Sequence, residues 1–278
     1  AVTIINAISC GLGAALGIDL KTEAEVKLTN EPGVIKGRIV SDPKESTILI
    51  EKTVSLVLRR FGLEDDYGAY VETRSEIPIA KGLKSSSAAA NAIALATLAA
   101  IGVDLDDVQI IKLGVDAAIE AGVTITGAFD DASASYFGDI VVTDNNKMEI
   151  LRRMPIGDYT VLIHVPPGKA YTAKSNVERM KLIGREVTAV HRLALEGKVW
   201  EAMTINGILY SLTLGYDASI VLDALNAGAL AAGLSGTGPA VAAIVPEEKV
   251  DSVQSAIGAY GGEIIKTRIN HKKAEIIK

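Results

Sequence analysis

The chain has 278 residues, 49% of them hydrophobic, and a formal net charge of −6. This length suffices for one large domain or two smaller domains that share an interface, and the acidic balance argues against a general nucleic-acid or membrane-surface binder. The single cysteine, Cys10, excludes an intrachain disulfide and a metal site made of clustered cysteines.

No apolar run in the sequence reaches the ~18 residues of a membrane span without interruption. The N-terminus has no basic region ahead of an apolar one, as a signal peptide would have. We therefore expect a soluble cytoplasmic protein with no membrane partner and no nucleic-acid partner.

Strands dominate the predicted elements of the first 75 residues. Residues 2–8 form an apolar run, which is typical of a buried strand. Residues 18–28 alternate between one side rich in apolar residues and one side of charged residues, which predicts a half-exposed strand. A third strand is predicted over residues 34–40, a helix over residues 47–60 and a fourth strand over residues 67–75.

Three glycines, Gly11, Gly13 and Gly17, separate the first two strands. The third glycine comes one residue too late for the G-x-G-x-x-G dinucleotide fingerprint, and no helical pattern follows it. We interpret the stretch as a link between strands that lets another group approach the backbone closely.

The sequence PIAKGLKSSSAAANAIALATLAA, residues 78–100, is the strongest functional signal. A helix start is predicted at the three serines 85–87, because serine favours the N-cap and alanine favours the helix interior. A helix start presents unpaired N–H groups and partial positive charge, to which Lys81 and Lys84 add full charges. We interpret the stretch as a phosphate-binding site; the alternative is a capped core helix behind a polar loop.

A helix predicted over residues 106–120, with Asp104 as its cap, precedes TITGAFDDASASYFG, residues 124–138. Asp130 and Asp131 are candidate catalytic carboxylates, because phosphoryl transfer needs a group that orients or deprotonates the attacking hydroxyl. Adjacent side chains in a strand point to opposite faces, so we expect only one of the two to reach the site. The alternative is a helix or turn cap with one solvated aspartate.

Strands and helices alternate in the second half, which indicates α+β layers. A hairpin over residues 140–143 and 149–152 precedes a candidate domain boundary at residues 155–158, where charge, proline and glycine cluster. The later predicted elements are a strand over residues 159–165, a basic loop and helix over residues 166–196, helices over residues 198–213 and 217–227, strands over residues 229–233 and 241–245, a helix over residues 247–259 and a strand over residues 263–268.

A second glycine-rich loop, LSGTGPA at residues 234–240, lies between two of these strands. Together with the lysine-bearing helix start, it suggests a nucleotide held between the two halves of the chain. The sequence has no Walker A motif, because Gly168-Lys169 is followed by alanine and no glycine stands five residues before it. It also has no protein-kinase catalytic-loop signature, and its three histidines show no metal-ligand spacing.

Three motifs together resemble the GHMP small-molecule kinases, a family that includes galactokinase, homoserine kinase, mevalonate kinase and phosphomevalonate kinase. The similar stretches are Pro78-x-x-x-Gly82-Leu83-x-Ser85-Ser86-x-Ala88 for the phosphate-binding motif, Leu234-Ser235-Gly236-Thr237-Gly238-Pro239 for the C-terminal glycine motif, and Gly127-Ala128-Phe129-Asp130-Asp131 for the segment with the catalytic aspartate. Within the family, the opening VTIINAISCGLGAALGIDL, the triple serine of GLKSSSA and the doubled aspartate of GAFDDA most resemble the archaeal-type shikimate kinases.

The resemblance implies an α+β, two-domain GHMP kinase fold. Residues 1–154 would form an N-terminal ATP- and phosphate-binding domain like ribosomal protein S5 domain 2, and residues 155–278 a ferredoxin-like C-terminal domain. The residues implied to bind ATP are Lys81, Gly82, Leu83, Lys84, Ser85, Ser86, Ser87, Ala88, Gly236 and Gly238. Mg2+ would bind near Ser86. Either Asp130 or Asp131 would face the acceptor hydroxyl: counting forward from Gly127 favours Asp130, and counting back from Gly138 favours Asp131.

The function implied is ATP-dependent phosphorylation of the 3-hydroxyl of shikimate, which gives shikimate 3-phosphate for aromatic amino-acid biosynthesis. The alternatives are another GHMP kinase, acting on homoserine or mevalonate, a nucleotide-binding relative without catalysis, and an RNA-associated protein, against which the acidic charge weighs. Shikimate is a carboxylate, so it requires a basic side chain. The candidates are Arg60, Arg153, Lys169, Lys174 and Arg179. The sequence leaves the oligomeric state open.

Overall fold

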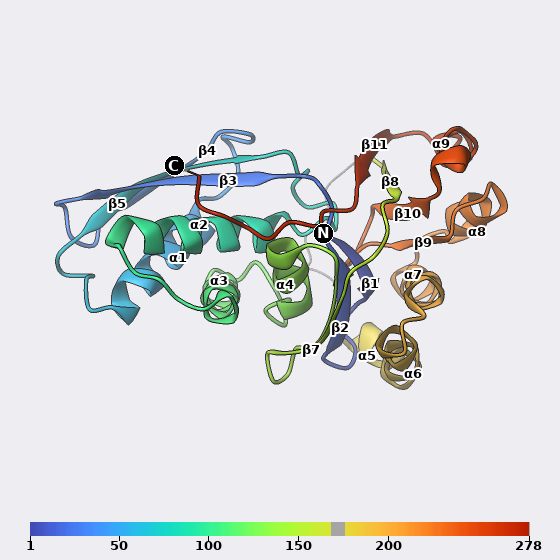
Figure 1. The fold of residues 1–278 in the computed structure, drawn as a ribbon, viewed down its shortest axis with the longest axis horizontal. Coiled ribbons are helices and arrows are strands. Elements are labelled where there is room, and N and C mark those ends of the chain that lie inside the picture. The colour runs from blue at the N-terminus through green and yellow to red at the C-terminus, as the bar shows by residue number, and fades with distance from the viewer. Residues whose placement is uncertain (168–175, 278) are drawn as a thin grey trace.

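The computed structural model describes residues 1–167 and 176–277, which form an elongated molecule with two regions (Figure 1). The elements of the first region are β1 (Val2–Ile5), β2 (Leu12–Leu16), β3 (Thr22–Thr29), β4 (Ile35–Ile39), α1 (Ile48–Arg60), β5 (Gly68–Ser75), α2 (Ser85–Ile101), α3 (Asp107–Glu120), α4 (Phe129–Phe137), β6 (Ile140–Asp144) and β7 (Glu149–Met154). Those of the second region are β8 (Thr160–Val165), α5 (Val177–Lys181), α6 (Gly184–Leu195), α7 (Val199–Leu214), α8 (Ser219–Asn226), β9 (Ala231–Leu234), β10 (Val241–Val245), a 3-10 turn (Glu247–Lys249), α9 (Val250–Gly258) and β11 (Glu263–Arg268).

The outer sheet of the first region has the strand order β3-β5-β4. β3 and β5 pair antiparallel over their full lengths, from Thr22 opposite Ser75 to Thr29 opposite Gly68. Side chains along β3 alternate between partly buried and exposed, as the alternating sequence predicts. The helices α1 and α2 cover the inner face, where Val54, Val71 and Ile93 belong to one apolar cluster (Figure 1).

Helix α2 is the central helix of the first region. Its alanine-rich sequence lets other elements approach its axis closely, and it contacts β3, α1, α3 and α4. Although it is the longest helix in the described parts of the chain, neither it nor any other helix there has the length and apolarity needed to cross a membrane.

Two further sheets meet at the middle of the molecule. The sheet β1-β2-β6-β7 belongs to the first region, and the antiparallel sheet β11-β8-β10-β9 belongs to the second region (Figure 1). One apolar cluster joins them, because Val2 and Ile4 from β1 share it with Leu234 from β9 and Met203 from α7. The backbone of α7 packs directly on β9, and a Cβ atom on Gly207 would overlap the Cα of Gly233.

The segment after β11 returns to the first region instead of ending in the second (Figure 1). The backbone N–H of Asn270 donates to Gly17 at 3.0 Å, and the N–H of Asp139 donates to Asn270 at 2.7 Å. Further along, Ala274 N–H donates to the carbonyl of Tyr136 at 2.6 Å. The first region therefore includes residues from both ends of the described chain.

Most predicted elements are present, with three differences of local structure. The glycine-rich stretch predicted as a link contains the strand β2, which pairs with both β1 and β6. Helix α3 is capped by Asp106, whose side chain accepts a hydrogen bond from Gln109 N–H, and not by Asp104. The pair Asp130 and Asp131, predicted within a strand, lies in the first turn of α4. The division into domains 1–154 and 155–278 stays a prediction.

Candidate active site

A cavity of about 220 Å³ lies between the two regions. Its lining comes from the loop after β1, the end of β4 and the start of α1, the end of β5, the loops before α2 and α4, and the loop after β9. The phosphate-binding motif, the aspartate pair and the C-terminal glycine motif therefore face a single space, although they are distant in sequence.

The loop before α2 enters the helix through residues in the left-handed backbone region. Gly82 has φ +81° and Lys84 has φ +66°. The helix begins at Ser85, as predicted, but Lys84 occupies the N-cap position and no serine side chain caps the helix. The left-handed turn at Lys84 leads the chain directly into the helix at Ser85, and all three serines fall within the first turn. N–H groups in the first turn of a helix have no partner within the helix, which leaves this end suited to an anion.

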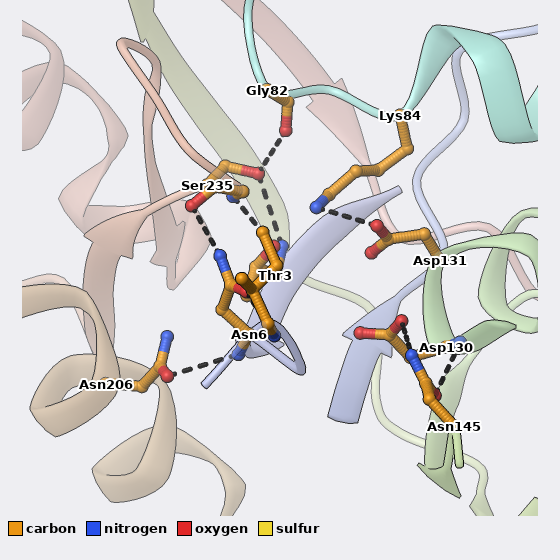
Figure 2. A network of polar contacts seen from close by, with 11 residues as sticks. Thr3, Asn6, Gly82, Lys84, Asp130, Asp131, Asn145, Asn206 and Ser235 are labelled. Carbon is orange, nitrogen blue, oxygen red and sulfur yellow. Dashed lines mark hydrogen bonds and ion pairs between the residues drawn. The ribbon is translucent and has the colours of Figure 1, made fainter. Parts of the chain in front are cut away.

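The two glycine-rich loops are bound to each other and to β1. Ser235 Oγ donates to the carbonyl of Gly82 at 2.8 Å and accepts from the N–H of Thr3 at 3.3 Å. The N–H of Gly236 donates to Thr3 Oγ1 at 2.8 Å, and Asn6 Nδ2 donates to the Gly236 carbonyl at 2.8 Å (Figure 2). A Cβ atom on Gly82 would overlap the carbonyl oxygen of Ser235, so glycine is required at this contact.

Lys84 forms a buried ion pair with Asp131. Its Nζ lies 2.9 Å from Asp131 Oδ2, and the two side chains are only 10% and 9% exposed. Figure 2 shows the lysine extending from the loop before α2 toward the carboxylate at the start of α4. The other oxygen, Asp131 Oδ1, is buried and has no hydrogen-bond partner among the described residues. Asp131 itself lines the cavity, so one oxygen of a cavity-lining carboxylate has no hydrogen bond within the described protein.

Asp130 has a different environment, although it is the next residue. Asn145 Nδ2 donates to Asp130 Oδ1 at 2.7 Å, and Asn145 Oδ1 accepts from the Asp130 N–H at 3.2 Å (Figure 2). Thr143 Oγ1 donates to the same Asn145 oxygen at 2.6 Å. Burial, and then the charge of Asp131, raise the pKa of Asp130 to about 7, while Lys84 opposes the rise.

Both aspartates line the cavity, so the prediction that only one would reach the site is wrong. The reason is the backbone conformation. Successive residues of a helix point about 100° apart, whereas those of a strand point to opposite faces, so both side chains can face one cavity. The helix N-terminus also favours negative charge at these two positions.

The structure brings most of the predicted binding residues to the cavity. Those that line it are Gly82, Leu83, Lys84, Ser85, Ser86, Ser87 and Gly236. Lys81, Ala88 and Gly238 are outside the lining. Lys81 Nζ donates to the Pro166 carbonyl at 2.5 Å, Ala88 packs against the central core, and Gly238 lies against Tyr216 and Leu234.

Of the basic residues considered for an acceptor carboxylate, the three that the structure describes, Arg60, Arg153 and Arg179, do not line the cavity. Lys169 and Lys174 lie outside the described residues. Arg60 interacts electrostatically with Asp116, Arg153 stacks 3.9 Å from the centre of the Phe137 ring, and Arg179 is exposed on α5.

Several cavity residues were not identified from the sequence. Ser41, Thr73 and Ser75 supply hydroxyl groups from the ends of β4 and β5, and Asn6 supplies an amide after β1. Strand ends beside a glycine-rich loop could have indicated them, but only after the strand order was known. Asn145 falls between the two strands of the predicted hairpin, over residues 140–143 and 149–152, and nothing in its local sequence shows that it binds Asp130.

The arrangement fits a nucleotide with Mg2+. The start of α2, with its serine hydroxyls, faces the cavity as an anion site would. No group of three or more His, Cys, Asp and Glu side chains able to hold a metal occurs in residues 1–167 and 176–277. Mg2+ in phosphoryl-transfer sites keeps several waters and is held by few protein oxygens together with substrate phosphates, so the hydroxyl of Ser86 suits this ion.

Comparison with known proteins agrees with this geometry. The chain matches the GHMP kinases N terminal domain over residues 49–139 and the GHMP kinases C terminal domain over residues 201–263. It is 53% identical to the shikimate kinase of Methanosarcina acetivorans, over 98% of this chain and 92% of that one. It is 42% identical to the shikimate kinase of Pyrococcus abyssi, over 97% of this chain and 96% of that one.

Solved structures show the same fold at low sequence identity. The mevalonate kinase of Methanococcus jannaschii has a TM-score of 0.76 and 20% identity, covering 97% of this chain and 96% of that one. Galactokinase of Lactococcus lactis, complexed with galactose, has a TM-score of 0.75 and 14% identity, covering 99% and 93%. The chain therefore belongs to the GHMP kinases, in the group that includes these archaeal shikimate kinases.

Proposed function

We propose that this chain is an ATP-dependent shikimate kinase, which transfers the γ-phosphoryl group of ATP to the 3-hydroxyl of shikimate and releases ADP. The names of the curated relatives support the acceptor, since they are shikimate kinases that match nearly the full chain. The main structural support for phosphoryl transfer is that a helix start suited to anions and a buried pair of carboxylates line the same cavity.

The loop before α2 is assigned to the phosphates. The first-turn N–H groups and the hydroxyls of Ser85, Ser86 and Ser87 supply donors for phosphate oxygens, and Gly236 contributes the opposite wall. Mg2+, held by Ser86 and the phosphates, would supply charge neutralisation on the transferring group. Because the loop is tied to β1 and to Ser235, its donors are fixed before the nucleotide binds.

Asp131 is assigned to the acceptor hydroxyl. Phosphoryl transfer forms an O–P bond at the hydroxyl oxygen and releases its proton, which a nearby carboxylate can accept. Asp131 Oδ1 is buried beside the cavity without a partner, whereas Asp130 is bound by Asn145. Asp130 therefore supports the site, and Asp131 orients the hydroxyl and receives its proton.

The first experiment measures ADP release with ATP and Mg2+ against shikimate, homoserine, mevalonate and galactose in parallel. Turnover on shikimate, with the product identified as shikimate 3-phosphate by NMR, is the expected result. Turnover on another acceptor would retain the kinase assignment and overturn the shikimate assignment. ATP binding without turnover on any of the four would favour a non-catalytic relative or an untested acceptor.

Two further assignments remain proposals. A cytoplasmic location is consistent with an enzyme that uses ATP, and cell fractionation would test it. The carboxylate of shikimate is assigned to a basic side chain that has not been identified. Single substitutions of Lys169, Lys174 and Arg179 would identify it by a raised KM for shikimate with an unchanged KM for ATP.

A further inference from the structure

We propose that Lys84 is a positioning residue for the acceptor-facing carboxylate: its ammonium group holds Asp131, through Oδ2, in the orientation that leaves Oδ1 without a hydrogen-bond partner among the described residues, and binding phosphate is not its main role. This inference rests on the proposed function and deepens it. A lysine in a phosphate-binding loop is ordinarily expected to bind phosphate directly. Here the described contacts assign its charge to a carboxylate instead.

The backbone directs the lysine toward α4. Lys84 is in the left-handed region, with φ +66°, immediately before the first residue of α2. A residue other than glycine, asparagine or aspartate is uncommon there, because its Cβ atom is crowded by the backbone. The side chain leaves the loop toward the start of α4, so that its Nζ lies 2.9 Å from Asp131 Oδ2 (Figure 2).

The ammonium group is enclosed on its other side by the second glycine-rich loop. A Cβ atom on Gly236 would lie 3.0 Å from Lys84 Nζ, closer than a side chain ordinarily comes. Gly236 is fixed in turn by its hydrogen bond to Thr3. The lysine is therefore held between Gly236 and Asp131, and both loops of the site contribute to placing the carboxylate.

The two lysines of the loop have different partners. Lys81 Nζ donates to the carbonyl of Pro166 in the second region. Lys84 is paired with the carboxylate of Asp131. It also interacts electrostatically with Asp130, and this interaction lowers the pKa of Asp130. Lys81 therefore provides a matched control from the same loop.

Loss of the Lys84 charge would leave two buried neighbouring carboxylates without their closest cation. Asp131 could then rotate or share a proton with Asp130, and either change would disturb the group that faces the acceptor hydroxyl. Nucleotide affinity would depend on Lys84 much less, because the helix start supplies the phosphate donors. The inference thus predicts an effect on kcat that exceeds the effect on ATP binding.

The test compares Lys84→Gln, Lys84→Arg and Lys81→Gln with the unchanged protein. The Kd of ATP is measured by calorimetry without acceptor, and kcat at saturating ATP and shikimate. Lys84→Gln is expected to lower kcat at least ~100-fold while changing the Kd of ATP less than about fivefold. Lys84→Arg is expected to regain about a tenth or more of kcat, because it restores the charge.

A readout that needs no turnover follows the carboxyl 13C resonance of Asp130 against pH in the nucleotide-free protein, assigned with Asp130→Asn. Its midpoint near 7 is expected to move upward in Lys84→Gln and to stay in place in Lys81→Gln. If Lys84→Gln instead weakens ATP binding ~100-fold, with kcat and the Asp130 midpoint unchanged, Lys84 is a phosphate ligand and the inference is overturned.

The same readout separates this inference from the proposed function. A moved Asp130 midpoint in Lys84→Gln, in a protein that turns over no acceptor, would support the carboxylate pairing and contradict the shikimate kinase assignment. Shikimate turnover with an unmoved Asp130 midpoint and an unchanged kcat in Lys84→Gln would support the shikimate kinase assignment and contradict the positioning role of Lys84.

Discussion

Gly13 lies directly against the carboxyl group of Asp130. A Cβ atom at residue 13 would stand 2.6 Å from the carboxyl carbon of Asp130, which no side chain tolerates without a shift. Gly13 belongs to β2, and its carbonyl also faces Thr143 Oγ1 at 3.4 Å. The glycine on β2 therefore makes the space that a carboxyl group on α4 occupies.

The substitution Gly13→Ala tests this contact. The added methyl group should displace Asp130 and, through the start of α4, its neighbour Asp131, so kcat should fall about tenfold or more with a smaller change in the KM of ATP. Gly157→Ala is the control, because a Cβ atom there meets its nearest neighbour at 3.6 Å, an ordinary contact. Equal kcat values in the two variants would show that the close approach has no catalytic consequence.

Substitution of the two aspartates by asparagine should separate their roles. Asp131→Asn removes the acceptor-facing anion and its pairing with Lys84, so we expect kcat to fall at least ~100-fold. Asp130→Asn should retain kcat within about tenfold, because Asn145 already binds this group by its amide and burial raises the pKa of Asp130 to about 7. Steady-state kinetics at pH 7.5 decide the matter. The opposite ranking would assign the proton-accepting role to Asp130.

Asn145→Ala should destabilise the protein as well as the site. It removes the amide that binds Asp130 and deprives the buried Asp130 N–H and Oδ1 of these hydrogen bonds, which costs about 1–3 kcal/mol for each group left unsatisfied. The free energy of unfolding in urea measures this loss. Asn146→Ala is the matched control, since the neighbouring side chain is exposed and bonds only the Cys10 carbonyl among the described contacts. Similar losses in both variants would contradict the prediction.

His271 should give the stability a pH dependence. Its Nδ1 lies 2.6 Å from Asp139 Oδ1 and its Nε2 lies 3.0 Å from Asp158 Oδ1, and the hydrogen bond with Asp139 is the main cause that raises the pKa of His271. A raised pKa in the folded state stabilises the protein fully below the unfolded pKa of about 6.5 and loses that contribution as pH rises through the folded pKa. The group is partly exposed, so the effect should be small.

The measurement is the difference in unfolding free energy between the unchanged protein and His271→Gln, followed from pH 5.5 to 8.5. This difference removes contributions from other groups, notably Asp130. We expect the advantage of the unchanged protein to shrink as pH rises above about 6.5. An advantage that is constant over this range, or that grows with pH, would exclude a charged His271 bridge.

The sequence was most informative where one local rule decided the structure. Alternating side chains placed the half-exposed strand β3, and the alanine-rich run placed α2. Prediction failed where tertiary contacts decided. The Gly11–Gly17 region looks like a turn-rich link, yet its backbone pairs with β1 and β6 on either side, which only the assembled sheet reveals.

In the site, too, local sequence motifs identified residues, whereas contacts between distant segments could not be predicted. The phosphate loop and the aspartates were found from local motifs. Lysines, serines and adjacent aspartates are unusual next to apolar helices and strands, so they stand out in the sequence. The partner of each group was not predictable in the same way. The motif predicts that Lys84 binds phosphate but does not show its contact with Asp131, and Asn145 lies in the predicted hairpin turn but also binds Asp130. Each of these pairings joins segments that are separate in sequence.

The returning segment after β11 has a consequence for how the chain is made. Asp139 and Tyr136, beside the carboxylate-bearing helix, obtain backbone hydrogen bonds from residues 270–274, and Ile18 forms a bridge with Ile269. On the ribosome, residues 1–154 emerge before residues 270–274 and lack these partners until that later segment has been synthesised. The helix that carries Asp130 and Asp131 thus acquires its final surroundings only after residues 270–274 have left the ribosome, so a nascent chain that stops short of this segment lacks part of the finished site.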